Sequence, residues 1–199
     1  MSDKAIDVVL LPEKAIADMA IEANGRLVEK FGDEIVLDKN KCLPHISLAM
    51  GCMDESDIAK ISDVLESISK NYKPMVLGVA GIDVETNSLG QKVSGFMIEN
   101  SQPLQSLHEE IMTKAQPLLT SDVSVEMIYP SGNISETTLQ WIKNYRDKAA
   151  FENFSPHITL GYGAIEDLQF PKEFKTSTLA LCHLGNHCTC REVLISFEL

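Results

Sequence analysis

Apolar positions along the chain alternate between two spacings, one typical of buried strands and one typical of amphipathic helices. A short apolar run over residues 5–11 indicates a strand, and apolar residues at every third or fourth position from Glu13 to Phe31 indicate a helix that Gly32 can end. The alternation continues to the C-terminus. We therefore predict further strands over residues 43–52, 75–85, 92–99, 123–128, 156–163, 178–184 and 188–199, and further helices over 54–68, 103–115 and 138–148.

These elements fall into two comparable halves, with no linker or low-complexity tract between them. Strands interleaved with helices in this way are typical of an α+β fold. We expect a single domain over residues 1–199 made of two related lobes, approximately 1–90 and 91–199, between which strands can be exchanged. The last two strands should form a hairpin through Gly185 and Asn186, a pair suited to a two-residue turn.

One segment of the first half recurs in the second half. Residues 44–51 read PHISLAMG and residues 156–163 read PHITLGYG, so five of the eight positions are identical. Ser47 against Thr159 preserves a hydroxyl group, and the two histidines, His45 and His157, are 112 residues apart. A lone histidine two residues before a hydroxyl occurs often by chance. Two copies at equivalent places of two halves indicate a duplicated functional unit.

The repeated residues suit the chemistry of phosphate esters. Side chains alternate between the faces of a strand, so His45 and Ser47 should share one face, as should His157 and Thr159. If the lobes pack about a pseudo-two-fold axis, both faces meet in one cleft. One neutral histidine can take a proton from the attacking oxygen while the other, protonated, gives one to the leaving oxygen. The hydroxyls can donate hydrogen bonds to the non-bridging phosphoryl oxygens.

The motifs over residues 45–48 (HISL) and 157–160 (HITL) resemble the paired signature of the 2H phosphoesterase superfamily, which includes 2′-5′ RNA ligase-like proteins and cyclic phosphodiesterases. The resemblance covers most of the chain, because its length and order of elements also fit. It implies a bilobal fold in which each lobe has an antiparallel sheet and flanking helices around a central cleft. It also implies catalysis by the two matched histidines without metal or cofactor, with the hydroxyls of Ser47 and Thr159 binding the phosphate.

Members of this superfamily act on 2′,3′-cyclic phosphates, 2′-5′ linkages, cyclic ADP-ribose phosphates or RNA ends, so the resemblance constrains the chemistry better than the substrate. We expect hydrolysis of a small 2′,3′-cyclic or 2′,5′-linked nucleotide phosphate. Two alternatives stay open: an RNA-end-processing, ligase-like protein, and a non-catalytic nucleotide-binding module with the same fold. The near-symmetric motifs do not distinguish the acid histidine from the base.

The charge balance bears on the size of the partner. Lysine and arginine total 17 against 29 acidic residues, a net charge of −12. Binding a long nucleic acid needs a broad basic surface, so the composition favours a small nucleotide or an RNA-end phosphate as partner. The apolar run near the start is too short for a signal peptide or a membrane span. We expect a cytoplasmic protein with reduced cysteines and no membrane contact; the sequence does not indicate an oligomeric state.

Several other residues are candidates for substrate contacts. Lys41 precedes the first motif and could attract a phosphate, and Phe154 precedes the second and could stack on a base. Tyr162 lies five residues after His157, so it should face the core if its strand is regular. The cysteines and histidines over residues 182–190 resemble a metal cluster, but a two-residue turn would bring at most three ligands to one face, which favours buried cysteines over metal.

Overall fold

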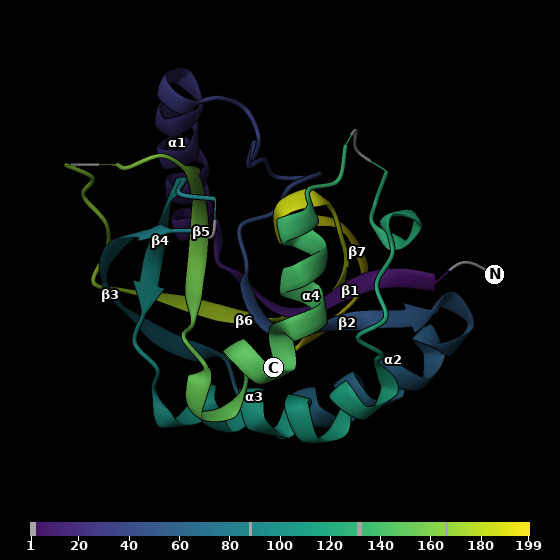
Figure 1. Cartoon of the computed structure of the whole chain (residues 1–199). Helices are drawn as coiled ribbons and strands as arrows, with labels where there is room; N and C mark the ends of the chain where they lie inside the picture. Colours follow the sequence, from purple (N-terminus) through teal and green to yellow (C-terminus); the bar gives the residue numbers. More distant parts are fainter. Residues whose placement is uncertain (1–2, 88, 131–132, 166) are drawn as a thin grey trace.

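The computed structural model describes residues 3–87, 89–130, 133–165 and 167–199. Its order of elements follows the predicted alternation closely (Figure 1). The strands are β1 (Asp3–Pro12), β2 (Ile46–Asp54), β3 (Met75–Thr86), β4 (Lys92–Ile98), β5 (His157–Tyr162), β6 (Glu173–Leu184) and β7 (Cys190–Glu198). The helices are α1 (Lys14–Phe31), α2 (Ile58–Ser69), α3 (Gln102–Lys114) and α4 (Glu136–Ala149), with short 3₁₀ turns η1 (Glu55–Asp57), η2 (Gln116–Leu118), η3 (Val125–Met127), η4 (Phe151–Asn153) and η5 (Asn186–Cys188).

The strands form one antiparallel sheet in the order β2-β1-β6-β3-β4-β5, with β7 paired to β6. The α+β class is therefore confirmed. The sheet is continuous, because β3 pairs with β6 along its first residues and with β4 along the rest. In Figure 1, β3, β4 and β5 lie to the left, β1, β2 and β7 to the right, and β6 connects the two parts. The division into lobes at residue 90 stays a prediction.

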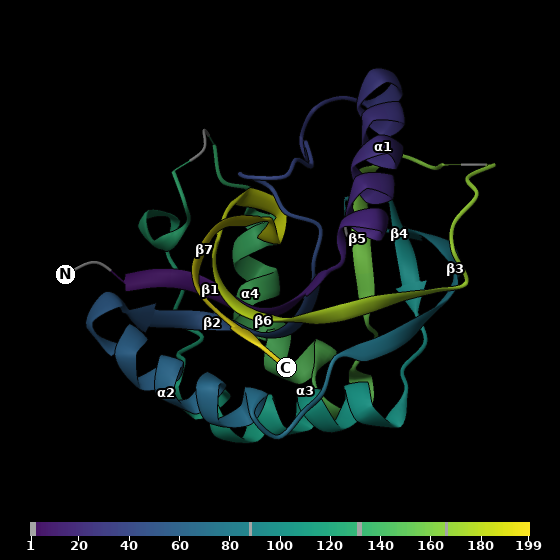
Figure 2. The same cartoon turned by 180° about the vertical axis from the view of Figure 1, so that it is seen from behind.

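Helices pack on both parts of this sheet. Seen from behind in Figure 2, α1 lies over β5, and α2 and α3 run along the lower edge. Helix α1 buries Ile16, Ala20, Ala23 and Leu27, and it ends at Gly32, whose φ of 109° suits glycine. On the other side of the sheet, α4 packs against β2 and η5. No helix within the described ranges is long and apolar enough to cross a membrane.

Two of the predicted local structures are wrong. Residues 123–128 do not form a strand: they contain η3, and the chain crosses the end of β6, where the His183 ring nitrogen Nε2 donates to the Met127 carbonyl at 2.9 Å. The β6–β7 hairpin does not turn at Gly185 and Asn186 alone. Its longer loop is closed by a 2.8 Å bond from the Gly185 amide to the Thr189 carbonyl, because Asn186 is held by a hydrogen bond from α4.

The longer loop changes which cysteines meet. Leu184 rather than His183 begins the pairing across the loop, and it lies opposite Cys190. Cys182 and Cys190 form a disulfide, so the expectation that all cysteines are reduced is wrong for this pair. Cys188 stays a free thiol in η5. Within the described part of the chain, no group of three or more histidine, cysteine or acidic side chains could hold a metal ion.

The two repeated segments carry the same irregularity. Leu48 is an extra residue in the pairing of β2 with β1, and Leu160 is an extra residue in the pairing of β5 with β4. Each is the fifth residue of its eight-residue repeat, directly after the hydroxyl residue. These are β-bulges, which turn the side chains that follow them to the opposite face of the strand. The duplication therefore includes the bulge as well as the motif.

Both bulge carbonyls are bound by a buried polar side chain from a helix. His108 of α3 lies 2.9 Å from the Leu48 carbonyl through Nδ1, and Asn24 of α1 donates to the Leu160 carbonyl at 2.8 Å. The Phe151 amide donates to Nε2 of His108 at 2.9 Å, so Nδ1 carries the hydrogen. An unpaired buried carbonyl would destabilise the fold by about 1–3 kcal/mol. These bonds hold the two motif strands in their bulged form.

The His108 contacts predict how stability depends on pH. Burial lowers the pKa of His108, so below the ordinary imidazole value of about 6.5 the unfolded chain binds a proton that the folded chain does not. The free energy of unfolding should therefore fall as the pH is lowered from about 7 to about 5. His108→Gln keeps a donor and an acceptor but cannot titrate, so its decrease should be smaller. Urea denaturation at both pH values checks this, and equal decreases in the two proteins would contradict it.

Candidate active site

The first motif fixes His45 at the start of β2. Its Nδ1 lies 2.8 Å from the carbonyl oxygen of Leu43, two residues earlier. The position of Leu43 is itself set by a 3.0 Å bond from its amide to the carbonyl of Cys190 on β7. A carbonyl can only accept, so Nδ1 carries the hydrogen and Nε2 of the neutral ring has a free lone pair. The imidazole is thus oriented with its basic nitrogen away from the main chain.

The second motif fixes His157 in the same way. Its Nδ1 lies 2.9 Å from the carbonyl oxygen of Ser155, again two residues earlier. The neutral ring of His157 therefore also presents Nε2. The repeated proline before each histidine keeps the chain extended there, which directs the preceding carbonyl at the ring.

The fold brings these two motifs together. Strands β2 and β5 lie within contact distance of each other, and the charge of His157 acts on His45 strongly enough to lower its pKa. The two imidazoles still differ in environment. The His45 side chain is 12% exposed, and burial is the main cause of its lowered pKa, whereas His157 is exposed. Near neutral pH, His45 is therefore biased toward the neutral form, which can accept a proton.

A third group in the site, Asp7 on β1, was not predicted from the sequence. It is fully buried, and its Oδ2 lies 2.6 Å from the Ser47 hydroxyl and 3.8 Å from Nε2 of His45. The available signal was an acidic residue in the middle of an otherwise apolar strand, between Ile6 and Val8. A buried carboxyl group in such a strand needs a partner, which indicates a role beyond packing.

The surroundings of Asp7 are protein rather than solvent. Burial raises its pKa well above the ordinary value, and the nearby Ser47 hydroxyl and the backbone amides of Ala49 and Leu48 in the bulge counter this only in part. The hydroxyl of Tyr145 from α4 and the thiol of Cys188 from η5 lie near enough to feel its charge, and burial raises the pKa of both groups. Helix α4 therefore closes one side of the site.

Tyr162 lies on the same face of β5 as the catalytic candidates, contrary to the prediction for a regular strand. The bulge at Leu160 reverses the alternation, so Tyr162 pairs with Val93 in a register that places its side chain on the face of His157 and Thr159. Its hydroxyl is 2.9 Å from Nδ1 of His187 in η5. A side chain expected in the core thus lies along the site.

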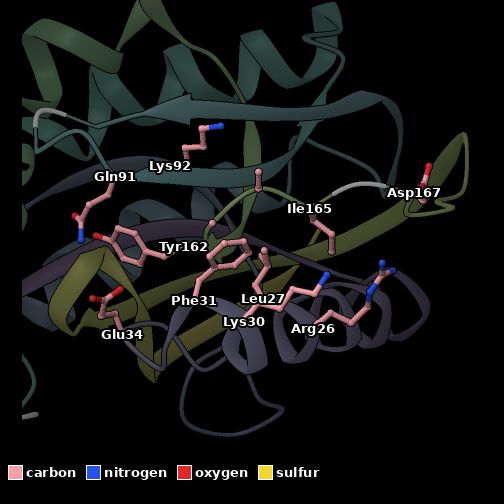
Figure 3. A pocket seen from close by; sticks show the side chains of 12 residues that line it. Arg26, Leu27, Lys30, Phe31, Glu34, Gln91, Lys92, Tyr162, Ile165 and Asp167 are labelled. Atoms are coloured by element: carbon pink, nitrogen blue, oxygen red, sulfur yellow. The ribbon is translucent and has the colours of Figure 1, made fainter.

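A cavity of about 710 Å³ begins at Tyr162 and extends past the end of β5 (Figure 3). Helix α1 contributes Arg26, Lys30 and Phe31, and Lys92 lies across from them. Glu34 and Asp167 also line the space, so its lining has both charge signs. Three cations around one cavity are notable in a chain with a net charge of −12.

The remaining sequence candidates lie in different surroundings. Phe154 is 8% exposed, and its ring stacks on His108 with the centroids 3.9 Å apart, so little of it is left for a base. Lys41 is exposed in the loop before β2, where its amide donates to the Asp38 carboxylate at 2.5 Å. Thr159 is half-buried, next to His157 on the exposed face of β5.

Comparison with known proteins decides the family. A family model described as the 2′-5′ RNA ligase superfamily matches residues 38–182, which is well over half of the chain and includes both motifs. The chain belongs to this superfamily. The resemblance to the 2H phosphoesterases inferred from the two motifs is thereby confirmed.

Solved structures support the fold of this superfamily member. TT0787 of Thermus thermophilus aligns over 98% of this chain and 97% of its own, with a TM-score of 0.63 and 16% identity. LigT of E. coli in apo form aligns over 100% and 99%, with a TM-score of 0.57 and 13% identity. No curated protein matches the chain. Membership of the superfamily supports phosphoesterase chemistry in general and leaves the substrate to be argued from the site.

The proximity of the two histidines predicts a measurable coupling. In His157→Gln the neighbouring positive charge is removed, so the pKa of His45 should rise relative to the native protein. It should stay below the ordinary value of about 6.5, because burial is unchanged and is the larger cause. Titration of the His45 imidazole resonances by NMR in both proteins measures the change. An unchanged His45 pKa would contradict this coupling.

Proposed function

We propose that this superfamily member is a phosphodiesterase that hydrolyses a small 2′,3′-cyclic or 2′,5′-linked nucleotide phosphate through His45 and His157, without a metal ion. The observation that carries the proposal is the pair of imidazoles on two strands in contact, each with Nδ1 held by a main-chain carbonyl, so that Nε2 is the nitrogen that can accept a proton. Two proton carriers of opposite protonation state are what hydrolysis of a phosphate ester at neutral pH requires.

In the proposed reaction on a 2′,3′-cyclic phosphate, Nε2 of neutral His45 takes a proton from water, whose oxygen forms a bond to phosphorus. The bond between phosphorus and one ribose oxygen breaks, and Nε2 of protonated His157 donates its proton to that oxygen. His45 is assigned as the base because its burial favours the neutral ring, and His157 as the acid because an exposed imidazolium keeps its hydration. Ser47 and Thr159 donate hydrogen bonds to the non-bridging oxygens.

The nucleoside and any second phosphate would extend along β5 toward the cavity beyond Tyr162. Three observations support this direction: Tyr162 shares the face of His157, the cavity starts at its ring, and Lys30, Lys92 and Arg26 supply positive charge there. LigT of E. coli, which shares the fold, has been crystallised with phosphate, with 3′-AMP and with NADP+. Those ligands are consistent in size with a nucleotide that reaches from the histidines into the cavity.

The central test compares the native protein with His45→Ala and His157→Ala for hydrolysis of 2′,3′-cyclic nucleotides in excess chelator. Each substitution should lower kcat by at least about 10²-fold, the usual share of one general acid or base. His183→Gln serves as a control, because that imidazole bonds the Met127 carbonyl and lies on the face of the sheet opposite to Asp7. Turnover that persists in both alanine variants, or that requires a metal, would refute the two-histidine mechanism.

The cavity makes a separate prediction about substrate binding. Lys30→Ala and Lys92→Ala should raise KM for a nucleotide that carries a second phosphate by about tenfold each, with little change in kcat, because both line the cavity beyond Tyr162, whose lining does not include the motif histidines. Lys14→Ala, at the opposite end of α1, is the matched control and should leave KM unchanged. Steady-state kinetics with substrates of one and two phosphates measure the effect. A kcat that falls while KM stays constant would place these lysines elsewhere in the mechanism.

A further inference from the structure

The contact between Asp7 and Ser47 limits where the hydroxyl hydrogen of Ser47 can point. Ser47 has one hydroxyl hydrogen, and its oxygen lies 2.6 Å from Oδ2 of Asp7, so a single hydrogen lies between these two oxygens. If Asp7 is ionised, it can only accept, and the hydrogen of Ser47 must point at it. Ser47 would then present only lone pairs to a phosphate, and lone pairs repel phosphoryl oxygens. An ionised Asp7 is therefore incompatible with phosphate binding by Ser47.

We propose that Asp7 is a positioning residue that keeps its carboxyl proton and donates it to the Ser47 oxygen, which frees the Ser47 hydrogen for the phosphoryl group. The chain of donors then runs from Asp7 through Ser47 to a non-bridging oxygen. A neutral carboxylic acid is a strong donor in a site shielded from water. This inference rests on the proposed function, because it assigns a phosphate to the site.

The groups around Asp7 favour the neutral acid. The carboxyl group of Asp7 lies near Ser47 and His45 of β2, and near enough to Tyr145 of α4 and Cys188 of η5 to interact with them electrostatically. Its register neighbour on β6 is the disulfide-bonded Cys182. The one cationic partner among these groups would be His45, whose burial disfavours its own charge. A carboxylate would therefore lie fully buried without a compensating cation, which is costly.

The surroundings of Oδ1, the second carboxyl oxygen of Asp7, are consistent with a neutral carboxylic acid. In the described part of the chain, Oδ1 of Asp7 has no hydrogen-bond partner of ordinary geometry. The amides of Leu48 and Ala49 in the bulge face the carboxyl group and counter part of the rise in its pKa. An ionised carboxylate has about four acceptor sites to satisfy, whereas the neutral acid has fewer. Burial with one short contact suits the neutral form.

The arrangement is present at one motif only. Asp7 lies opposite Met50 on β2, and the corresponding position of the second motif, opposite Tyr162, is occupied by Val93 on β4. Thr159 therefore has no carboxyl donor from the equivalent position of its neighbouring strand. The two hydroxyls are expected to bind the phosphate with different strength, Ser47 more tightly than Thr159.

The test uses two substitutions of Asp7. Asp7→Val copies the residue of the second motif and leaves the Ser47 hydroxyl free to rotate, so its hydrogen is no longer directed at the phosphate. We expect kcat/KM to fall by about 10²-fold, the usual loss when one donor is no longer preorganised. Asp7→Asn places an amide N–H beside Ser47 and cannot ionise, so it should rescue activity to within about tenfold of the native value. If Asp7→Asn is as impaired as Asp7→Val, an ionised carboxylate is required and the proposal is overturned. Native activity in both variants would overturn it too.

A double-mutant cycle tests whether Asp7 acts through Ser47. In a Ser47→Ala background, Asp7→Val should cause no further loss of kcat/KM, because the hydrogen that Asp7 orients is gone. Additive losses would show that Asp7 acts elsewhere, for example on His45. Thermal unfolding of each variant separates lost activity from lost structure, and the valine variant is suited to a buried strand.

Two further measurements separate this proposal from the proposed hydrolysis. The infrared difference spectrum of native protein minus Asp7→Asn at neutral pH should contain the carbonyl band of a protonated carboxyl group; carboxylate bands alone would overturn the proposal. Affinity for inorganic phosphate should fall in Asp7→Val and recover in Asp7→Asn, and equal affinities in all three proteins would overturn it. Both readouts work without turnover, so a native protein that cleaves no cyclic nucleotide would refute only the proposed function.

Discussion

Two hydrogen bonds to bulge carbonyls hold the arrangement on which the rest of the site depends. Asn24 binds the Leu160 carbonyl and His108 binds the Leu48 carbonyl, each from a helix that packs on the motif strand. Without the bulges, the alternation of side chains would continue unbroken, and the residues after each hydroxyl would turn to the other face. In each motif strand, the histidine and the hydroxyl residue therefore share one face, and the bulge after them changes the face to which the remaining side chains point.

The sequence predicts the helices, all but one of the proposed strands in outline, and the two motifs, because these depend on local periodicity and on a clear repeat. Periodicity assumes a regular strand, so it misplaced Tyr162, which the bulge turns toward the site. It also could not detect Asp7 as a partner of Ser47, since the two residues are 40 positions apart and meet only through the β1–β2 register. The prediction of a two-residue turn at Gly185 and Asn186 was wrong, because a hydrogen bond from α4 to Asn186 favours a longer loop.

The β6–β7 loop shows how a distant helix can shape the site. His187 and Cys188 both have left-handed backbone angles, with φ of 58° and 53°, which cost about 1 kcal/mol or more each in residues other than glycine. Thr138 of α4 offsets this by binding both the Asn186 side chain and the His187 amide, at 2.9 and 2.8 Å. The strained loop places His187 against Tyr162 on β5, the strand of the second motif. It thus links the two parts of the sheet on the side of the two motif histidines.

A duplicated motif starts symmetric, but the proposed hydrolysis needs one base and one acid, so it requires different surroundings for the two copies. Here the motif residues themselves are nearly identical, down to the carbonyl that each Nδ1 binds, and the differences lie in what packs around them. His45 lies beside the buried Asp7 at the start of β2, the strand that α4 packs against, while His157 is exposed to solvent. Burial disfavours a charged imidazole, so the enclosed copy is the one suited to accept a proton and the open copy the one suited to carry it. The neighbouring strands differ too, with Asp7 on β1 and Val93 on β4, so the two motif hydroxyls, which we propose bind the phosphate, also have different surroundings.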